Sequence, residues 1–167
     1  MPHLQSALQT ARWLTKSTDD AEDVVQEAAL RAFRFMDGLQ SNSAKAWFLT
    51  IVRRVAFDFR QKSRRFVFSD DTFGAGEEIH ADDPTFQPPP QSAEEGLIAS
   101  AKLRDVRLAV SRLPESLRII LLLREVESLT YEQISQVENI PIGTVMSRLS
   151  RARRQLKDIL MSTGGVN

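Results

Sequence analysis

The sequence contains no cysteine and only two histidines, and these absences exclude several classes of protein. Without cysteine the chain forms neither a disulfide scaffold nor a thiolate metal site, as is typical of a reducing compartment. It has no run of about 18 apolar residues and no signal-peptide pattern, so we expect a soluble, cytoplasmic protein without membrane insertion. His3 and His80 lie in peripheral segments, and no nucleophile–base pair or phosphate-binding glycine loop is present. We therefore expect no metal, no cofactor and no catalytic residue.

Charge is balanced overall but unevenly distributed along the chain. The 167 residues include 22 basic and 22 acidic ones, yet residues 62–100 hold three of the basic and eight of the acidic side chains. Segment 66–96 has no lysine or arginine and includes Pro88-Pro89-Pro90, which disfavours a helix and favours an extended backbone. We expect a flexible acidic linker over 66–96, between a first domain at 1–65 and a second domain at 97–167.

On both sides of this linker, apolar residues recur at helical spacing, and no strand-like alternation occurs. The expected fold class is therefore all-α, with two small helical domains. In the first domain we expect helices over about 4–15, 19–38 and 44–65, the second capped by Asp19 or Asp20. The side chains expected to face its core are Leu4, Leu8, Trp13 or Leu14, Ala21, Val24, Val25, Ala28, Ala32, Phe35, Met36, Leu39, Trp47, Ile51, Val55 and Phe59.

The second domain is expected to begin with two helices and to end in a helix-turn-helix. Residues 94–113 form the first helix, ended by Pro114, and residues 115–128 form the second. Thr130 and Gln133 have the spacing of a capping box, which starts a helix. The interior side chains expected here are Ile119, Ile120, Leu122, Leu123, Ile134 and Val137.

The turn and the last helix have their own signals. Asn139 falls where the chain must turn, and asparagine tolerates the left-handed backbone that such turns often need. Pro141 opens the next helix, where its missing N–H is no loss. That helix has a buried stripe of period 3.6, formed by Val145, Leu149, Ala152, Leu156 and Ile159 or Leu160.

The other side of this last helix is basic and free of acids. Five lysines and arginines lie between Arg148 and Lys157, and no acid precedes Asp158. Ser147, Ser150, Arg151 and Arg154 share one face, and such a face suits a DNA major groove. A solvated amphipathic helix is the plain alternative, but the coincidence of capping box, turn, proline and basic face favours DNA binding.

Three segments, in this order, resemble the extracytoplasmic-function (ECF) sigma factors of bacteria, in the sigma-70 superfamily. "DDAEDVVQEAALRAF" resembles region 2.2 of that family, and "AKAWFLTIVRRVAFDFRQKSRR" resembles regions 2.3 and 2.4. "LTYEQISQVENIPIGTVMSRLSRARRQL" resembles region 4.2, so the resemblance spans about residues 4–160. It implies a protein that binds RNA polymerase core, recognises the −10 and −35 promoter elements and helps to open the DNA.

The resemblance also implies site residues in the first domain. Asp23, Gln26 and Glu27 match the face that docks on the polymerase, and they share one helix face; a solvated acidic face is the alternative. The loop around residue 42 matches the segment that captures an unpaired −10 base, which needs polar partners for the flipped base. The −10 candidates are Asn42, Ser43, Lys45, Arg53, Arg54 and Arg60, with Arg64 and Arg65 in a run that a solvated surface explains almost equally well. Trp47 matches a position near the melting junction, but a core role is simpler.

For the second domain and the linker, the resemblance implies further contacts. Its −35 candidates are Thr144, Met146, Ser147, Arg148, Ser150, Arg151, Arg153 and Arg154, of which Arg148, Arg153 and Arg154 are assigned to phosphates. The acidic linker resembles the segment that threads through the polymerase. An anti-sigma factor that grips both domains is expected as a further partner.

The sequence also departs from the family pattern and leaves alternatives open. Asn139 replaces the usual turn glycine and Ser135 a usual alanine. Met1-Pro2-His3 stands where family members often have more helix, so the first domain is either compact or incomplete at its N-terminus. One rival is a sigma mimic that sequesters an anti-sigma factor, but the chain has no room for a receiver domain. A second rival is an operator-binding regulator, but that reading leaves the first domain unexplained. A third is an enzyme, but no catalytic site is visible in the sequence.

Overall fold

The protein is all-helical in the computed structural model, which describes residues 2–39, 43–67 and 101–164. This confirms the predicted fold class, whereas Asn42 and nearly all of the predicted linker lie outside the described residues. None of the helices in these ranges is long and apolar enough to cross a membrane. The helices are α1 (Leu4–Leu14), α2 (Thr18–Arg34), the 3-10 turn η1 (Met36–Gly38), α3 (Ala44–Val67), α4 (Ala101–Ser111), α5 (Glu115–Glu125), α6 (Tyr131–Glu138) and α7 (Ile142–Gly164).

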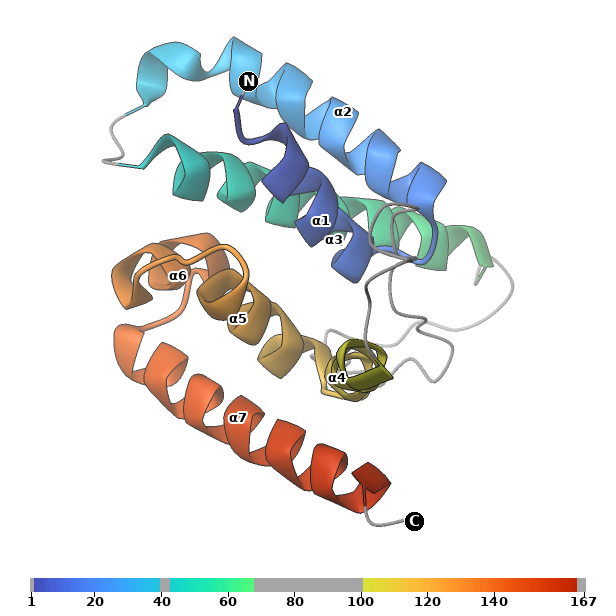
Figure 1. The fold of residues 1–167 in the computed structure, drawn as a ribbon. Helices are drawn as coiled ribbons and strands as arrows, with labels where there is room; N and C mark the ends of the chain where they lie inside the picture. The colour runs from blue at the N-terminus through green and yellow to red at the C-terminus, as the bar shows by residue number, and fades with distance from the viewer. Residues whose placement is uncertain (1, 40–42, 68–100, 165–167) are drawn as a thin grey trace.

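Helices α1, α2 and α3 pack against one another and bury mostly small residues (Figure 1). The N-cap of α2 is Ser17, whose hydroxyl accepts a hydrogen bond from the Asp20 N–H at 3.1 Å, so the prediction of an aspartate cap is wrong. Serine and aspartate are about equally good caps, so the residue type alone does not decide between them.

Four side chains predicted to lie in the core are exposed instead. Helix α2 ends at Arg34, and η1 turns the chain before the apolar stripe can continue. A residue beyond that end no longer follows the 3.6-residue period, because the period belongs to the helix alone. The exposed residues beyond that end are Phe35, Met36 and Leu39, and the fourth is Leu4, the first residue of α1.

The buried face of α3 is centred about one residue away from the predicted one. Phe48, Leu49 and Val52 are buried together with Val55, whereas Trp47, Ile51 and Phe59 are only half-buried. Helix α3 packs against α1 and α2 on one side and against α6 on another. A helix with neighbours on two sides buries a wider arc than one amphipathic stripe.

The second domain is formed by α4 to α7, and its predicted core is confirmed, except that Leu156, Ile159 and Leu160 are only half-buried. Ile119, Ile120 and Leu123 of α5 are fully buried, and α7 packs against α4, α5 and α6. Arg118 of α5 is also buried, and its guanidinium donates to the carbonyls of Ser111 and Leu113 at 3.2 and 3.4 Å. These bonds satisfy carbonyls that the end of α4 leaves without a helical partner.

The two domains lie against each other. Helix α6 contacts α3, and α5 contacts α1, so that α5 and α6 lie between the first domain and α7 (Figure 1). The guanidinium of Arg107 in α4 lies over the Trp13 ring of α1, 5.9 Å from its centroid. The basic outer face of α7 is therefore on the side of the molecule away from α3.

Candidate nucleic-acid interface

The helix-turn-helix has the local geometry that its sequence predicts. The Thr130 N–H donates to Oε1 of Gln133 at 2.9 Å, and the Gln133 N–H donates to Oγ1 of Thr130 at 3.2 Å. Asn139 has a φ of 53°, in the left-handed region. Helix α7 begins at Ile142, one residue later than predicted, and the Pro141 carbonyl accepts its first helical bonds.

Removing the cap should destabilise the second domain without touching the basic face. Thr130→Ala leaves the Gln133 N–H without its partner, and we expect it to lower the free energy of unfolding by about 1 kcal/mol. Chemical denaturation followed by circular dichroism measures this loss. Thr163→Ala, near the exposed end of α7, is the matched control and should change stability by less than about 0.5 kcal/mol. Equal stability of both variants would contradict the assigned cap.

Helix α7 separates an apolar face from a polar one. Val145, Leu149 and Ala152 are buried against the other helices, as predicted. The side chains predicted to face DNA lie on the opposite side: Met146, Ser147, Ser150, Arg151, Arg153 and Arg154 are exposed, and Thr144 and Arg148 are half-buried. The structure thus brings the predicted −35 residues together on one surface.

One arginine of this surface is tied to a neighbouring helix. Nη2 of Arg153 lies 2.8 Å from Oε1 of Glu125 in α5. This hydrogen bond raises the pKa of Arg153 above its ordinary value. Arg153 therefore lies at the edge of the α7 surface, beside α5.

The three predicted polymerase-docking residues lie on the exposed side of α2. Asp23, Gln26 and Glu27 are all exposed. Glu27 accepts a hydrogen bond from Arg31 at 2.8 Å, and Arg31 also contacts Asp58 of α3 at 3.3 Å. Arg31 thus connects Glu27 of this face to Asp58 of α3.

Two apolar residues on the same face were missed by the sequence analysis. Leu30 is 58% exposed and Phe33 is 75% exposed. Leu30 lies four residues after Gln26, and Phe33 lies three residues after Leu30, so both lie on the same side of α2 as the polar face. The signal was available in the sequence, because Leu30 and Phe33 fall outside the stripe of Ala21, Val24, Ala28 and Ala32 that forms the core.

The predicted −10 residues lie along α3 and at its start. The Ser43 hydroxyl accepts the Ala46 N–H at 3.2 Å, as an N-cap does, so part of its role is structural. Nζ of Lys45 lies 2.9 Å from Oε2 of Glu127, in the turn between α5 and α6. Arg54, Arg64 and Arg65 are exposed.

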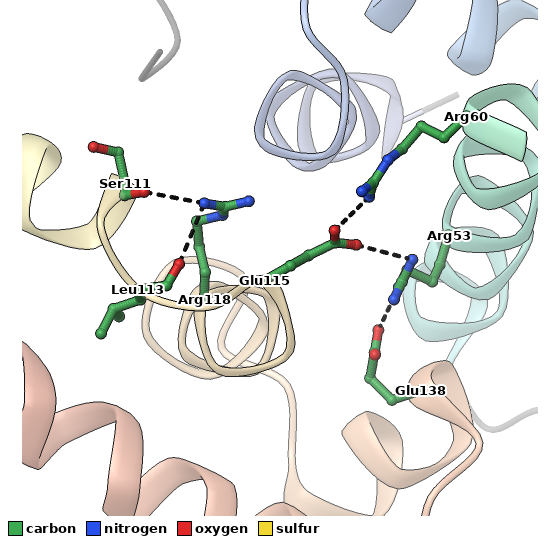
Figure 2. Close-up of polar contacts among 7 residues, drawn as sticks. All are labelled: Arg53, Arg60, Ser111, Leu113, Glu115, Arg118 and Glu138. Atoms are coloured by element: carbon green, nitrogen blue, oxygen red, sulfur yellow. Dashed lines mark hydrogen bonds and ion pairs between the residues drawn. The ribbon is translucent and has the colours of Figure 1, made fainter. Parts of the chain in front are cut away.

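The remaining two candidates contact acids of the second domain (Figure 2). Nε of Arg53 lies 2.9 Å from Oε1 of Glu138, and its Nη1 lies 3.7 Å from Oε1 of Glu115. Nη1 of Arg60 lies 2.5 Å from Oε2 of Glu115. No role for these acids was predicted from the sequence.

Glu115 is ionised at neutral pH. Burial of its carboxyl acts to raise the pKa of Glu115, but the hydrogen bond from Arg60 and the charges of Arg60 and Arg53 outweigh burial and lower it. A carboxyl with a lowered pKa contributes its pairing energy above the ordinary value of about 4.3 and loses it as the pH falls further. The contacts of Glu115 therefore hold throughout the neutral range.

Comparison with known proteins gives the family. Residues 1–66 match the model of "Sigma-70 region 2", and residues 103–156 match that of "Sigma-70, region 4". The chain is 34% identical over 152 residues to the ECF RNA polymerase sigma-E factor of Escherichia coli K12, which covers 82% of this chain and 72% of that protein. The chain belongs to the ECF RNA polymerase sigma factors. As such it is a non-catalytic subunit that directs RNA polymerase to promoters.

Two further relatives support the same family. The sigma-E factor of Haemophilus influenzae is 30% identical over 148 residues, which are 85% of this sigma factor and 75% of that protein. The sigma factor RpoE of Bartonella quintana, solved in complex with the anti-sigma factor NepR, has a TM-score of 0.71 and 29% identity. That match covers 96% of this chain and 92% of the solved one, so the likeness includes both helical domains.

Proposed function

We propose that this sigma factor reads the −35 element with the exposed face of α7. The observation that carries the proposal is the separation of that helix into a buried apolar stripe and an exposed face that has no acid before Asp158. Arg and Ser side chains there reach base edges, and the arginines at the margin neutralise phosphates. Thr144, Met146, Ser147, Ser150 and Arg151 form the centre of the face, with Arg148, Arg153 and Arg154 around it.

In the same proposal, α3 and the loop before it contact the −10 element and favour its opening. Lys45, Arg53, Arg54 and Arg60 supply positive charge along one helix, and Asn42 and Ser43 supply polar groups for a flipped base. The domain division at 1–65, 66–96 and 97–167 belongs to this proposal, with the acidic linker following the polymerase channel. Its 31 residues reach up to about 100 Å, enough for two elements roughly 70 Å apart.

Polymerase core docks on the exposed side of α2 in this proposal. Asp23, Gln26 and Glu27 form the polar part of the face, and Leu30 and Phe33 form an apolar part next to it. A patch with an apolar, aromatic centre and a polar margin is the usual composition of a protein interface. The sigma factor would work in the cytoplasm, and an anti-sigma factor is proposed as a second partner because the Bartonella quintana relative was solved with one.

Run-off transcription tests this function as a whole. Purified core polymerase is offered a promoter library with and without the protein, and start sites that depend on the protein are sequenced. We expect a defined set of such starts with shared −35 and −10 sequences. If core polymerase starts at the same sites without the protein, the proposed function is wrong.

Two arginines of α7 should differ in how they affect DNA binding. Arg151→Ala removes a group from the centre of the face, so we expect a loss of about 1–3 kcal/mol and a relaxed preference at one −35 position. Arg153→Ala removes a phosphate contact, so it should weaken all sites alike and reduce the salt dependence. Binding of matched and mismatched −35 duplexes at several salt concentrations separates the two effects. The exposed Arg104 of α4 supplies the control variant, Arg104→Ala, and equal losses on every duplex for both α7 variants would contradict the assignment.

A further inference from the structure

Ion pairs between cations of α3 and carboxylates of the second domain hold the two domains together. Three cations of the first domain meet three carboxylates of the second. The pairs, which we call the interdomain ion-pair cluster, are Lys45–Glu127, Arg53–Glu138, Arg53–Glu115 and Arg60–Glu115.

The cations of this cluster share one face of α3. Lys45, Arg53 and Arg60 are separated by eight and seven residues, so at 3.6 residues per turn they lie within an arc of about 80°. At 1.5 Å per residue they extend over about 22 Å of the helix. The second domain therefore covers a continuous strip of α3 and not a single point.

The acids of the cluster are largely removed from water. The side chain of Glu138 is 5% exposed and that of Glu127 is 4% exposed. The Lys45 ammonium also donates to the Glu127 carbonyl at 2.9 Å, so it has two acceptors on this turn. A carboxylate without water needs its cation, because an unpaired buried charge is strongly unfavourable. The contact thus depends on all three cations being turned toward the second domain.

Lys45, Arg53 and Arg60 are three of the four cations that the proposed function assigns to the −10 element, and the fourth, Arg54, is exposed. A guanidinium held by a buried carboxylate is not available to a DNA phosphate on the same side of the helix. We infer that the free sigma factor is closed on itself, with the second domain occupying the −10-binding face of α3 through the interdomain ion-pair cluster. The blocking of −10 DNA binding rests on the proposed −10 contacts of α3. The closure itself rests on the ion pairs alone.

The closed arrangement also prevents simultaneous contact with both promoter elements. Helices α5 and α6 alone separate α3 from α7 (Figure 1). With about 8–10 Å between the axes of packed helices, α3 and α7 are roughly 20 Å apart. The two elements lie about two duplex turns apart, roughly 70 Å. Binding to polymerase and promoter must therefore break the cluster, while the outer face of α7 is exposed in either state.

Energy transfer between two dyes tests the closure without DNA or polymerase. The chain lacks cysteine, so Gln9→Cys in α1 and Lys157→Cys in α7 label exposed positions of the two domains specifically. The test variant carries Glu115→Gln, Glu127→Gln and Glu138→Gln. The control variant carries Asp105→Asn, Glu132→Gln and Asp158→Asn, which change the net charge equally at exposed positions. We expect high transfer in the wild type and the control, and low transfer in the test variant.

Salt provides a second measurement that needs no substitution. Ionic strength screens charges, so transfer in the wild type should fall between about 50 mM and about 500 mM salt while the circular dichroism stays helical. This result is decisive even if the triple variant folds poorly. High transfer that is insensitive to both salt and the triple substitution overturns the role of the interdomain ion-pair cluster, and low transfer in the wild type overturns the closure itself.

Binding of a random single-stranded oligonucleotide tests the occlusion of α3. If the open state holds about a tenth of the free protein, opening should raise the affinity of the test variant about tenfold over the control. Equal affinities of the two variants overturn the occlusion. Adding Arg53→Ala to the open variant should then reduce the affinity. An unchanged affinity there refutes the proposed −10 contact and leaves the dye measurement, made without DNA, standing.

Discussion

Replacing Gln26 by alanine and Glu27 by lysine is expected to abolish binding to RNA polymerase core and leave the helical fold intact. Both side chains are exposed on α2, in line with Leu30 and Phe33. Side chains at the centre of an interface typically contribute 2 kcal/mol or more, so the dissociation constant should rise by about 30-fold or more. The lost Glu27–Arg31 pair is exposed and contributes only about 0.3–0.5 kcal/mol to stability.

The measurement is binding of immobilised core polymerase to the purified variants. The control carries the same chemical changes elsewhere, Gln9→Ala in α1 and Glu132→Lys in α6, both at exposed positions. Phe33→Ala, which removes an exposed ring, should also weaken the complex because aromatic residues often dominate interfaces. Unchanged affinity for the Gln26 and Glu27 variant, with a normal circular dichroism spectrum, would mean that polymerase docks on another face.

The second large effect is expected from Leu149→Ala, inside the second domain. Leu149 is 1% exposed and lies on the buried stripe of α7, against which α5 and α6 pack. Truncating a buried leucine to alanine removes its transfer free energy and leaves a cavity, at a cost of about 2–5 kcal/mol. Because small proteins are stable by only about 5–15 kcal/mol, this is a large share of the total.

Denaturant unfolding followed by circular dichroism measures this loss. Met161→Ala on the same helix is the control, because its side chain is exposed and its truncation should change stability by less than about 0.5 kcal/mol. Leu149→Ala should also weaken −35 binding near the unfolding midpoint, since α7 presents its face only when its opposite side is packed. Equal midpoints for both variants would contradict the position of Leu149 in the core.

Much of the second domain could be predicted because its signals are local. The capping box of Thr130 and Gln133 and the left-handed backbone of Asn139 depend on residues within a turn of one another. The buried stripe of α7 follows from a period that one helix sets for itself. The predicted face for −35 DNA is the complement of that stripe, so the structure places all of its residues on one surface.

The first domain shows where such local reasoning stops. Phe35 and Leu39 continue the apolar period of α2 in the sequence, yet both are exposed because the helix ends at Arg34. Leu30 and Phe33 are exposed as well, although their type favours burial. An apolar residue is buried only where another element covers it, so the residue type alone does not decide its burial.

The sequence by itself determined the helices, the basic face of α7 and the membership of the sigma-factor family, since each depends on neighbouring residues or on motif order. Only the tertiary structure decided that Arg53 meets Glu138 and that Lys45 meets Glu127, residues more than 80 positions apart. Helical spacing predicts which side chains share a face of a helix, but it does not predict which other element packs against that face. Which acid pairs with which cation depends on how the two domains pack, and that packing depends on the surfaces of both domains.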